Sequence, residues 1–107
     1  MVNKIFWTDT ARASLKIIFN YYKEHVSISL AQKIRNTIFE DIKILKTHKF
    51  VGVKEPLLEK FEIEYRYLIS GNYKLIYFIK DENIIISLVF DTRQNPQKLQ
   101  SIIKDKD

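Results

Sequence analysis

The scarce arginines are the residues whose type and position could bind a charged partner. The chain has fourteen lysines and only four arginines, so lysine supplies its general positive charge. A planar guanidinium makes two parallel hydrogen bonds to a carboxylate or phosphate, which a lysine ammonium cannot do. Two of the arginines fall on predicted helix faces, but Arg66 lies inside a predicted strand and Arg93 directly follows another. We expect Arg66 and Arg93 to meet on one anionic ligand or acidic partner. The alternative is that each pairs with a local carboxylate, such as Asp91 or a glutamate of residues 59–64.

The sequence lacks the residues that other kinds of catalytic or metal site need. The absence of cysteine excludes a thiol nucleophile and a thiolate metal site. His25 and His48 fall in a loop and at a helix end, and two glycines cannot build a glycine-rich phosphate loop. Four glutamates gather in one loop: Glu55, Glu59, Glu62 and Glu64. Such a loop is more often solvated than metal-binding, so we expect no metal and no cofactor.

Length and composition place these residues in one small globular protein. A chain of 107 residues with 46% hydrophobic and 29% charged residues corresponds to a single domain, residues 1–107. No run approaches about 20 apolar residues, so no membrane span is predicted. The segment Met1–Trp7 reaches charged residues too early for a signal peptide. We therefore expect a cytoplasmic protein.

The positive charge is concentrated in the first half of the chain. The formal net charge is +5, and residues 1–53 carry nine Lys/Arg against four Asp/Glu, whereas residues 54–107 carry nine of each. This asymmetry favours an acidic partner or a polyanion. The alternative is a solvated, lysine-rich helix surface.

Two amphipathic helices are predicted to dominate that first half. A strand over Val2–Trp7 precedes Thr8, which is placed to cap a helix that runs to about Glu24. The Ser29–Gln32 segment has capping-box spacing and predicts the start of a second helix. Because the loop between them is short, the two helices should form an antiparallel hairpin.

Three consecutive strands are predicted in the second half: Tyr65–Ile69, Tyr73–Lys80 and Ile84–Phe90. Turns at residues 70–72 and 81–83 make them an antiparallel meander. The fold class is therefore α+β, in the order β-α-α-β-β-β, with the hairpin on one face of a mainly antiparallel four-stranded sheet. The last two strands are apolar on both faces, so we expect the second face to be an apolar patch that another chain covers. A short terminal helix is predicted over residues 97–104. The expected core comprises Leu15, Ile18, Phe19, Ile34, Ile38, Ile42, Leu75, Tyr77, Ile86 and Leu88.

The sequence resembles the RelE/ParE superfamily of type II toxins, and is closer to its ParE-like, plasmid-stabilisation branch. The resemblance lies in Tyr65–Ile69, Gly71–Tyr77 and Val89–Pro96, with support from Trp7–Ala11 and Gly52–Leu57. It covers nearly the whole chain, and the order of elements agrees. It implies a toxin that a cognate antitoxin protein neutralises in a hetero-oligomeric complex.

The superfamily resemblance implies one of two targets. RelE-like members are ribosome-dependent mRNA endoribonucleases, whereas ParE-like members inhibit DNA gyrase and have no known hydrolytic site. Arg66 and Arg93 match basic positions of the ribonucleases, and Lys54 and Lys74 could add charge. However, no tyrosine or histidine follows Phe90, so the C-terminal acid/base of a ribonuclease has no counterpart. We therefore expect a gyrase inhibitor that performs no hydrolysis.

Two alternatives to gyrase inhibition stay open. The first is a ribonuclease acting on ribosome and mRNA through Arg66, Arg93, Lys54 and Lys74, with the acid supplied by Glu62, Glu64 or Asp91. The second is a toxin-like interaction module without activity. The residues expected to bind the target or the antitoxin are Arg66, Tyr73, Lys74 and Arg93.

Overall fold

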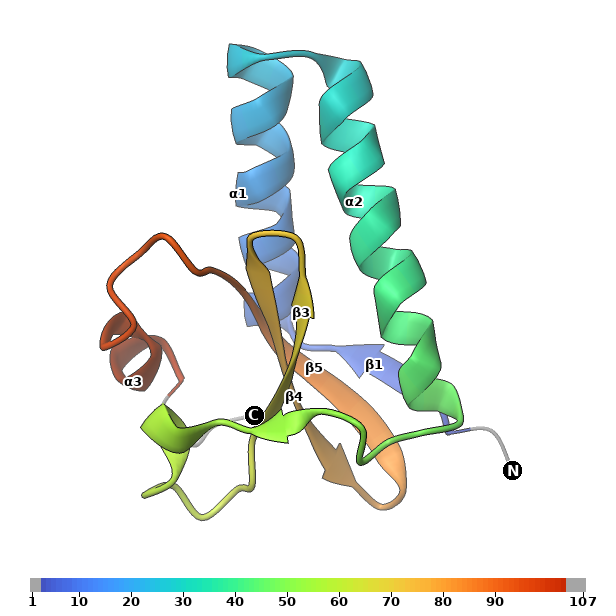
Figure 1. Cartoon of the computed structure of the whole chain (residues 1–107), viewed down its shortest axis with the longest axis vertical. Helices are drawn as coiled ribbons and strands as arrows, with labels where there is room; N and C mark the ends of the chain where they lie inside the picture. Colours follow the sequence, from blue (N-terminus) through green and yellow to red (C-terminus); the bar gives the residue numbers. More distant parts are fainter. Residues whose placement is uncertain (1–2, 104–107) are drawn as a thin grey trace.

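The fold is a five-stranded sheet covered on both faces (Figure 1). The computed structural model describes residues 3–103. Its strands are β1 (Ile5–Trp7), β2 (Val53–Lys54), β3 (Arg66–Ser70), β4 (Tyr73–Lys80) and β5 (Asn83–Asp91). They lie in the order β1-β5-β4-β3-β2, with β1 parallel to β5 and the other pairs antiparallel. The predicted meander is confirmed, and Val2 lies outside the described residues. The predicted count of four strands is one short, because the two-residue β2 has too few residues for an alternating pattern to show.

The helical hairpin forms as predicted, except at the start of its second helix. Its helices are α1 (Asp9–His25) and α2 (Ile28–Ile42), followed by the 3₁₀ helix η1 (Lys43–Lys46). Thr8 caps α1, since its Oγ1 accepts a hydrogen bond of 3.0 Å from the Ala11 amide. Ser27 caps α2 by accepting from the Leu30 amide at 3.1 Å, so the prediction that the helix starts at Ser29 is wrong. Ser27 takes this role because it is the first extended residue after the tight end of α1.

The first core layer lies between the hairpin and the sheet, and most of the predicted core belongs to it. Leu15, Ile38, Ile42, Leu75, Tyr77 and Ile86 are all buried there. Ile18 and Ile34 are partly buried at its margin. Phe19 is an exception, because it is half-buried and lies beneath the guanidinium of Arg35.

The second face of the sheet is covered by the chain itself, so the predicted open apolar patch on that face is wrong. The covering elements are the 3₁₀ helix η2 (Pro56–Leu58), the loop that follows it and α3 (Lys98–Ile102). These elements bury Leu58, Tyr65, Leu99 and Ile103 against Ile76, Phe78, Leu88 and Phe90. The irregular spacing of apolar residues in 55–65 concealed this second layer. The predicted terminal helix is confirmed over Lys98–Ile102, and residue 104 of its predicted range lies outside the described residues.

The hairpin extends past the sheet along the long axis of the molecule, as Figure 1 shows. Its outer part therefore has more surface available for partners than the part above the sheet. Within residues 3–103, no helix is both long and apolar enough to cross a membrane.

Candidate functional site

The predicted site residues do not all gather in one place, and the two arginines do not meet. Arg66 begins β3 and lies opposite Tyr77 of β4. Arg93 follows Asp91, which ends β5 and lies opposite Tyr73, the first residue of β4. In an antiparallel meander of three strands, the start of the first strand and the end of the third lie at opposite ends of the sheet. The expectation that both arginines share one ligand is therefore wrong.

Arg66 holds a loop of its own chain. Its Nη1 donates to the carbonyl oxygens of Phe50 and Gly52, at 3.2 and 2.8 Å, and its Nη2 donates to Glu64 at 3.3 Å. The guanidinium also lies 5.2 Å from the centre of the Phe50 ring. Only 15% of the side chain is exposed. Arg66 thus pairs with a local glutamate, as the alternative interpretation held, and anchors the segment between η1 and β2.

The two lysines of the predicted site are also paired with local carboxylates. The Nζ of Lys74 lies 2.5 Å from an oxygen of Glu55, whose side chain is fully buried, and 4.3 Å from the centre of the Tyr67 ring. A buried carboxylate needs such a partner, so Lys74 has a structural role. Lys54 lies 3.1 Å from Glu64, and this hydrogen bond lowers the pKa of the Glu64 carboxyl.

Tyr73 and Arg93 do come together, through a residue that the sequence analysis did not single out for function. Arg93 binds both carboxylate oxygens of Asp91, at 2.9 and 2.8 Å, and donates to the hydroxyl of Tyr22 at 3.2 Å. The hydroxyl of Tyr73 donates to the same Tyr22 oxygen at 3.5 Å. Tyr22 belongs to the apolar stripe of α1, and only its polar hydroxyl signalled a role beyond packing.

These hydrogen bonds change the acidity of the groups in the cluster. Those from Tyr73 and Arg93 lower the pKa of Tyr22, whereas burial raises the pKa of Tyr73. The guanidinium of Arg93 lowers the pKa of Asp91. The cluster holds one ion pair, between Arg93 and Asp91, and 56% of the Arg93 side chain is exposed to solvent.

An open groove of about 930 Å³ lies beside this cluster, between α1 and the end of β5. Its α1 wall includes Ile17, which is 70% exposed, and Tyr21, which is 56% exposed. Val26 and Ile102 continue the apolar surface, and Arg93 lies among the lining residues. We call this surface the α1–β5 groove. An apolar groove with a charged residue at its wall is suited to binding a segment of another protein.

The cations of the predicted site are gathered only in part. Cleavage of a phosphodiester needs a base, an acid and cations around a single phosphate. Here Lys54 and Arg66 lie opposite each other and share Glu64, whereas Lys74 and Arg93 lie elsewhere, on Glu55 and Asp91. Within residues 3–103, no three His, Asp or Glu side chains gather in a way that could hold a metal ion.

Comparisons with known proteins give a family match and a structural match. A family model described as the ParE toxin of the type II toxin–antitoxin system parDE matches residues 5–96. A solved structure titled "Chromosomal ParDE TA system from P. aeruginosa" superposes with a TM-score of 0.70 at 22% sequence identity. The superposition covers 84% of this chain and 96% of that one. No curated protein matches the sequence.

Proposed function

Since this chain belongs to the ParE toxin family and is thus the toxin of a type II toxin–antitoxin system, we propose that it inhibits DNA gyrase by binding alone. The observation that carries this proposal is the distribution of its basic groups. They lie in three places, and each is held by a carboxylate: Arg66 together with Lys54 on Glu64, Lys74 on Glu55, and Arg93 on Asp91. A toxin built in this way acts by occupying a surface of its target.

The α1–β5 groove is where we place the contact with gyrase. It offers exposed apolar side chains, with Ile17 and Tyr21 foremost, and Arg93 supplies a positive charge beside them. Burying exposed apolar surface supplies affinity, and a charge at the margin orients the partner. Of the residues predicted to bind the target, Tyr73 and Arg93 belong to this groove, whereas Arg66 and Lys74 are assigned structural roles.

A supercoiling assay with purified gyrase tests the proposal. Added toxin should reduce supercoiling, and Ile17→Ser should weaken that inhibition about tenfold, because it removes a large exposed apolar side chain from the groove. Ile44→Ser is the matched control, since Ile44 is also exposed but lies in η1, away from the groove. It should inhibit as the unaltered chain does.

Two results would overturn the proposal in different ways. Cutting of mRNA only when ribosomes are present, with gyrase unaffected by excess toxin, would establish the ribonuclease alternative. A chain that neither slows growth when expressed nor affects either target would be an inactive interaction module. If Ile17→Ser and Ile44→Ser inhibit gyrase equally, the contact lies outside the groove.

A further inference from the structure

The cluster of Tyr22, Tyr73, Asp91 and Arg93 has two hydrogen-bond donors to spare beside the α1–β5 groove. The first donor belongs to Arg93. Its Nε and Nη2 atoms bind the two oxygens of Asp91, and Nη2 also donates to Tyr22. Its Nη1 atom makes no hydrogen bond within residues 3–103. Since more than half of the side chain is exposed, Nη1 is accessible to a partner.

The second donor is the hydroxyl of Tyr22. Its oxygen accepts from Arg93 at 3.2 Å and from Tyr73 at 3.5 Å. Both contacts use lone pairs of the oxygen, so the Tyr22 proton stays available for donation. In the part of the chain that the structure describes, this proton has no acceptor. The hydrogen bonds from Tyr73 and Arg93 lower the pKa of Tyr22, and they polarise the hydroxyl into a stronger donor.

The planar shape of the guanidinium places the two donors next to each other. Asp91 occupies the edge that Nε and Nη2 form. The N–H of Nη2 that reaches Tyr22 therefore lies on the other edge, parallel to an N–H of Nη1. An acceptor bound to Nη1 must lie beside the Tyr22 hydroxyl. Two neighbouring donors of this kind match the two oxygens of a carboxylate.

The surroundings of the donors favour a carboxylate over a phosphate. Arg93 and Asp91 are the only charged residues among those described that line the groove. Asp91 accepts three hydrogen bonds from Arg93, from its backbone amide, Nε and Nη2, so the positive charge is largely compensated. A phosphodiester needs several cations around it, which this groove does not supply. The exposed apolar side chains of Ile17 and Val26 line the same groove, and hydrogen bonds are stronger in such apolar surroundings.

We propose that Tyr22 and Arg93 form a carboxylate-binding site in the α1–β5 groove, and that the ligand is an acidic side chain of gyrase. One carboxylate oxygen accepts from Nη1 of Arg93, and the other accepts from the Tyr22 hydroxyl. Asp91 and Tyr73 are positioning residues, because Asp91 holds one edge of the guanidinium and Tyr73 occupies a lone pair of Tyr22. The inference rests on the proposed function only in naming gyrase as the source of the carboxylate.

Acetate is the probe for this site, because it presents a carboxylate and little else. The isotope-labelled full chain is titrated with sodium acetate, while the NMR signal of the Arg93 Nε–H group is recorded. Sodium chloride at the same ionic strength and inorganic phosphate are the competing anions. We expect a saturable shift of the signal with acetate, no such shift with chloride, and weaker binding of phosphate.

Tyr22→Phe should weaken acetate binding about fivefold, since it removes one of the two donors. The matched control is Tyr67→Phe, which removes the same hydroxyl group from a tyrosine of β3 that does not line the groove. This variant should bind acetate as the unaltered chain does. In both variants the signal of Arg93 is retained, so one measurement serves for the comparison.

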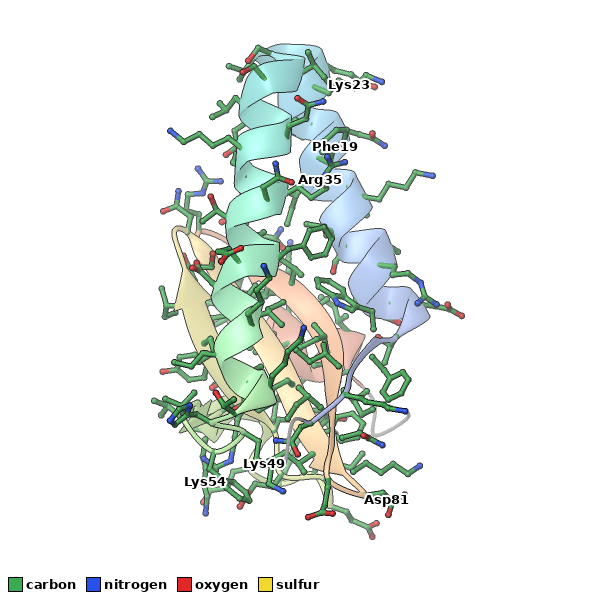
Figure 2. All side chains as sticks on the ribbon, turned by 90° about the vertical axis from the view of Figure 1, so that its right-hand side faces the viewer. Phe19, Lys23, Arg35, Lys49, Lys54 and Asp81 are labelled. Carbon is green, nitrogen blue, oxygen red and sulfur yellow. The ribbon has the colours of Figure 1, made fainter. Side chains whose placement is uncertain are left out.

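Arg93→Lys tests whether the shape of the arginine, in addition to its charge, is needed against gyrase. Lysine keeps the charge but lacks the planar fork, so inhibition of supercoiling should weaken about tenfold. Arg35→Lys is the matched control. Figure 2 shows Arg35 beside Phe19 where α1 and α2 meet, with its guanidinium 4.8 Å from the centre of that ring. Since Arg35 does not line the groove, this variant should inhibit as the unaltered chain does.

The two assays separate this inference from the proposed function. The carboxylate site is overturned if acetate causes no shift, if phosphate binds more tightly than acetate, or if Tyr22→Phe and Tyr67→Phe bind acetate equally. Gyrase is overturned as the source of the carboxylate if Arg93→Lys inhibits supercoiling as well as the unaltered chain does. A chain that binds acetate as expected but leaves gyrase unaffected confirms the site and overturns the proposed function.

Discussion

At the scale of single residues, polar side chains from the second half of the chain stabilise the loop that leads into β2. Tyr77 donates to the carbonyl of Lys49 at 2.8 Å and accepts from the amide of Gly52 at 2.9 Å. Arg66 binds the carbonyl of the same glycine. A Cβ atom at position 52 would lie 2.4 to 2.8 Å from the phenol of Tyr77, so only glycine fits beneath that ring. Two polar side chains and one glycine therefore fix the loop that leads into β2.

Gly52→Ala should lower the free energy of unfolding by about 2–3 kcal/mol, because the added methyl group overpacks a buried site. Gly71→Ala is the control: Gly71 has a φ of +58°, and nothing lies within 4 Å of an added Cβ. Its cost should be about 1 kcal/mol, from backbone strain alone. Urea unfolding of both variants measures the difference. If the two costs are equal, Tyr77 does not close over the glycine.

The site could be predicted from the sequence only in part, for a reason that Arg66 illustrates. Its type and position in a strand correctly indicated a geometric role, but a guanidinium binds a backbone carbonyl as well as it binds a ligand. Tyr22 was overlooked because its position in an apolar helical stripe predicts packing. The cluster that joins it to Tyr73 and Arg93 depends on the register of β4 and β5, which no local pattern gives.

At the scale of elements, the starts of the two long helices differ in how firmly they are fixed. Ser27 caps α2 through one hydrogen bond to the Leu30 amide. Thr8 caps α1 and also donates to the carbonyl of Ser87 at 3.3 Å. The first turn of α1 is thereby tied to β5, whereas the first turn of α2 lies at the exposed end of the hairpin.

Thr8→Ala should cost more stability than Ser27→Ala, about 2 kcal/mol against about 1 kcal/mol, because it loses a cap and a contact to the sheet. Thermal unfolding of the two variants, followed by circular dichroism, measures the difference. Equal midpoints would show that the hydrogen bond from Thr8 to the sheet contributes nothing. Thr8→Ser, which keeps the hydroxyl, should recover most of the loss.

Long periodic elements were predicted well, and short irregular ones were not. The apolar stripes of α1 and α2 and the alternation in β4 and β5 report burial over many residues. By contrast, β2 has two residues and η2 has three, too few to show a period. Their positions follow from tertiary packing, which is also why the cover on the second face was missed.

At the scale of the whole molecule, the sheet is enclosed between two apolar layers of the same chain. The second layer depends on α3, a helix of only five residues. Leu99 and Ile103 are fully buried there, whereas Ile102 is 41% exposed. A helix this short is not stable on its own, so its buried side chains hold it in place.

Leu99→Ala should destabilise the protein by about 2–4 kcal/mol, since it leaves a cavity in the second layer. Ile102→Ala on the same helix is the control and should change stability by less than about 0.5 kcal/mol, as for most surface substitutions. Chemical denaturation of both variants gives the comparison. A small effect of Leu99→Ala would mean that the second layer contributes little to the fold.

The parallel pairing of β1 with β5 has a consequence for synthesis of the toxin in the cell. Ile5 pairs with Ile84, so the first strand finds its neighbour only after nearly the whole chain has left the ribosome. At about 5–20 residues per second, some 80 residues take about 4–16 s to translate. The hairpin can form early in that interval, but the sheet cannot. A nascent toxin therefore stays incomplete for seconds, and an antitoxin already present in the cell can meet it during that time.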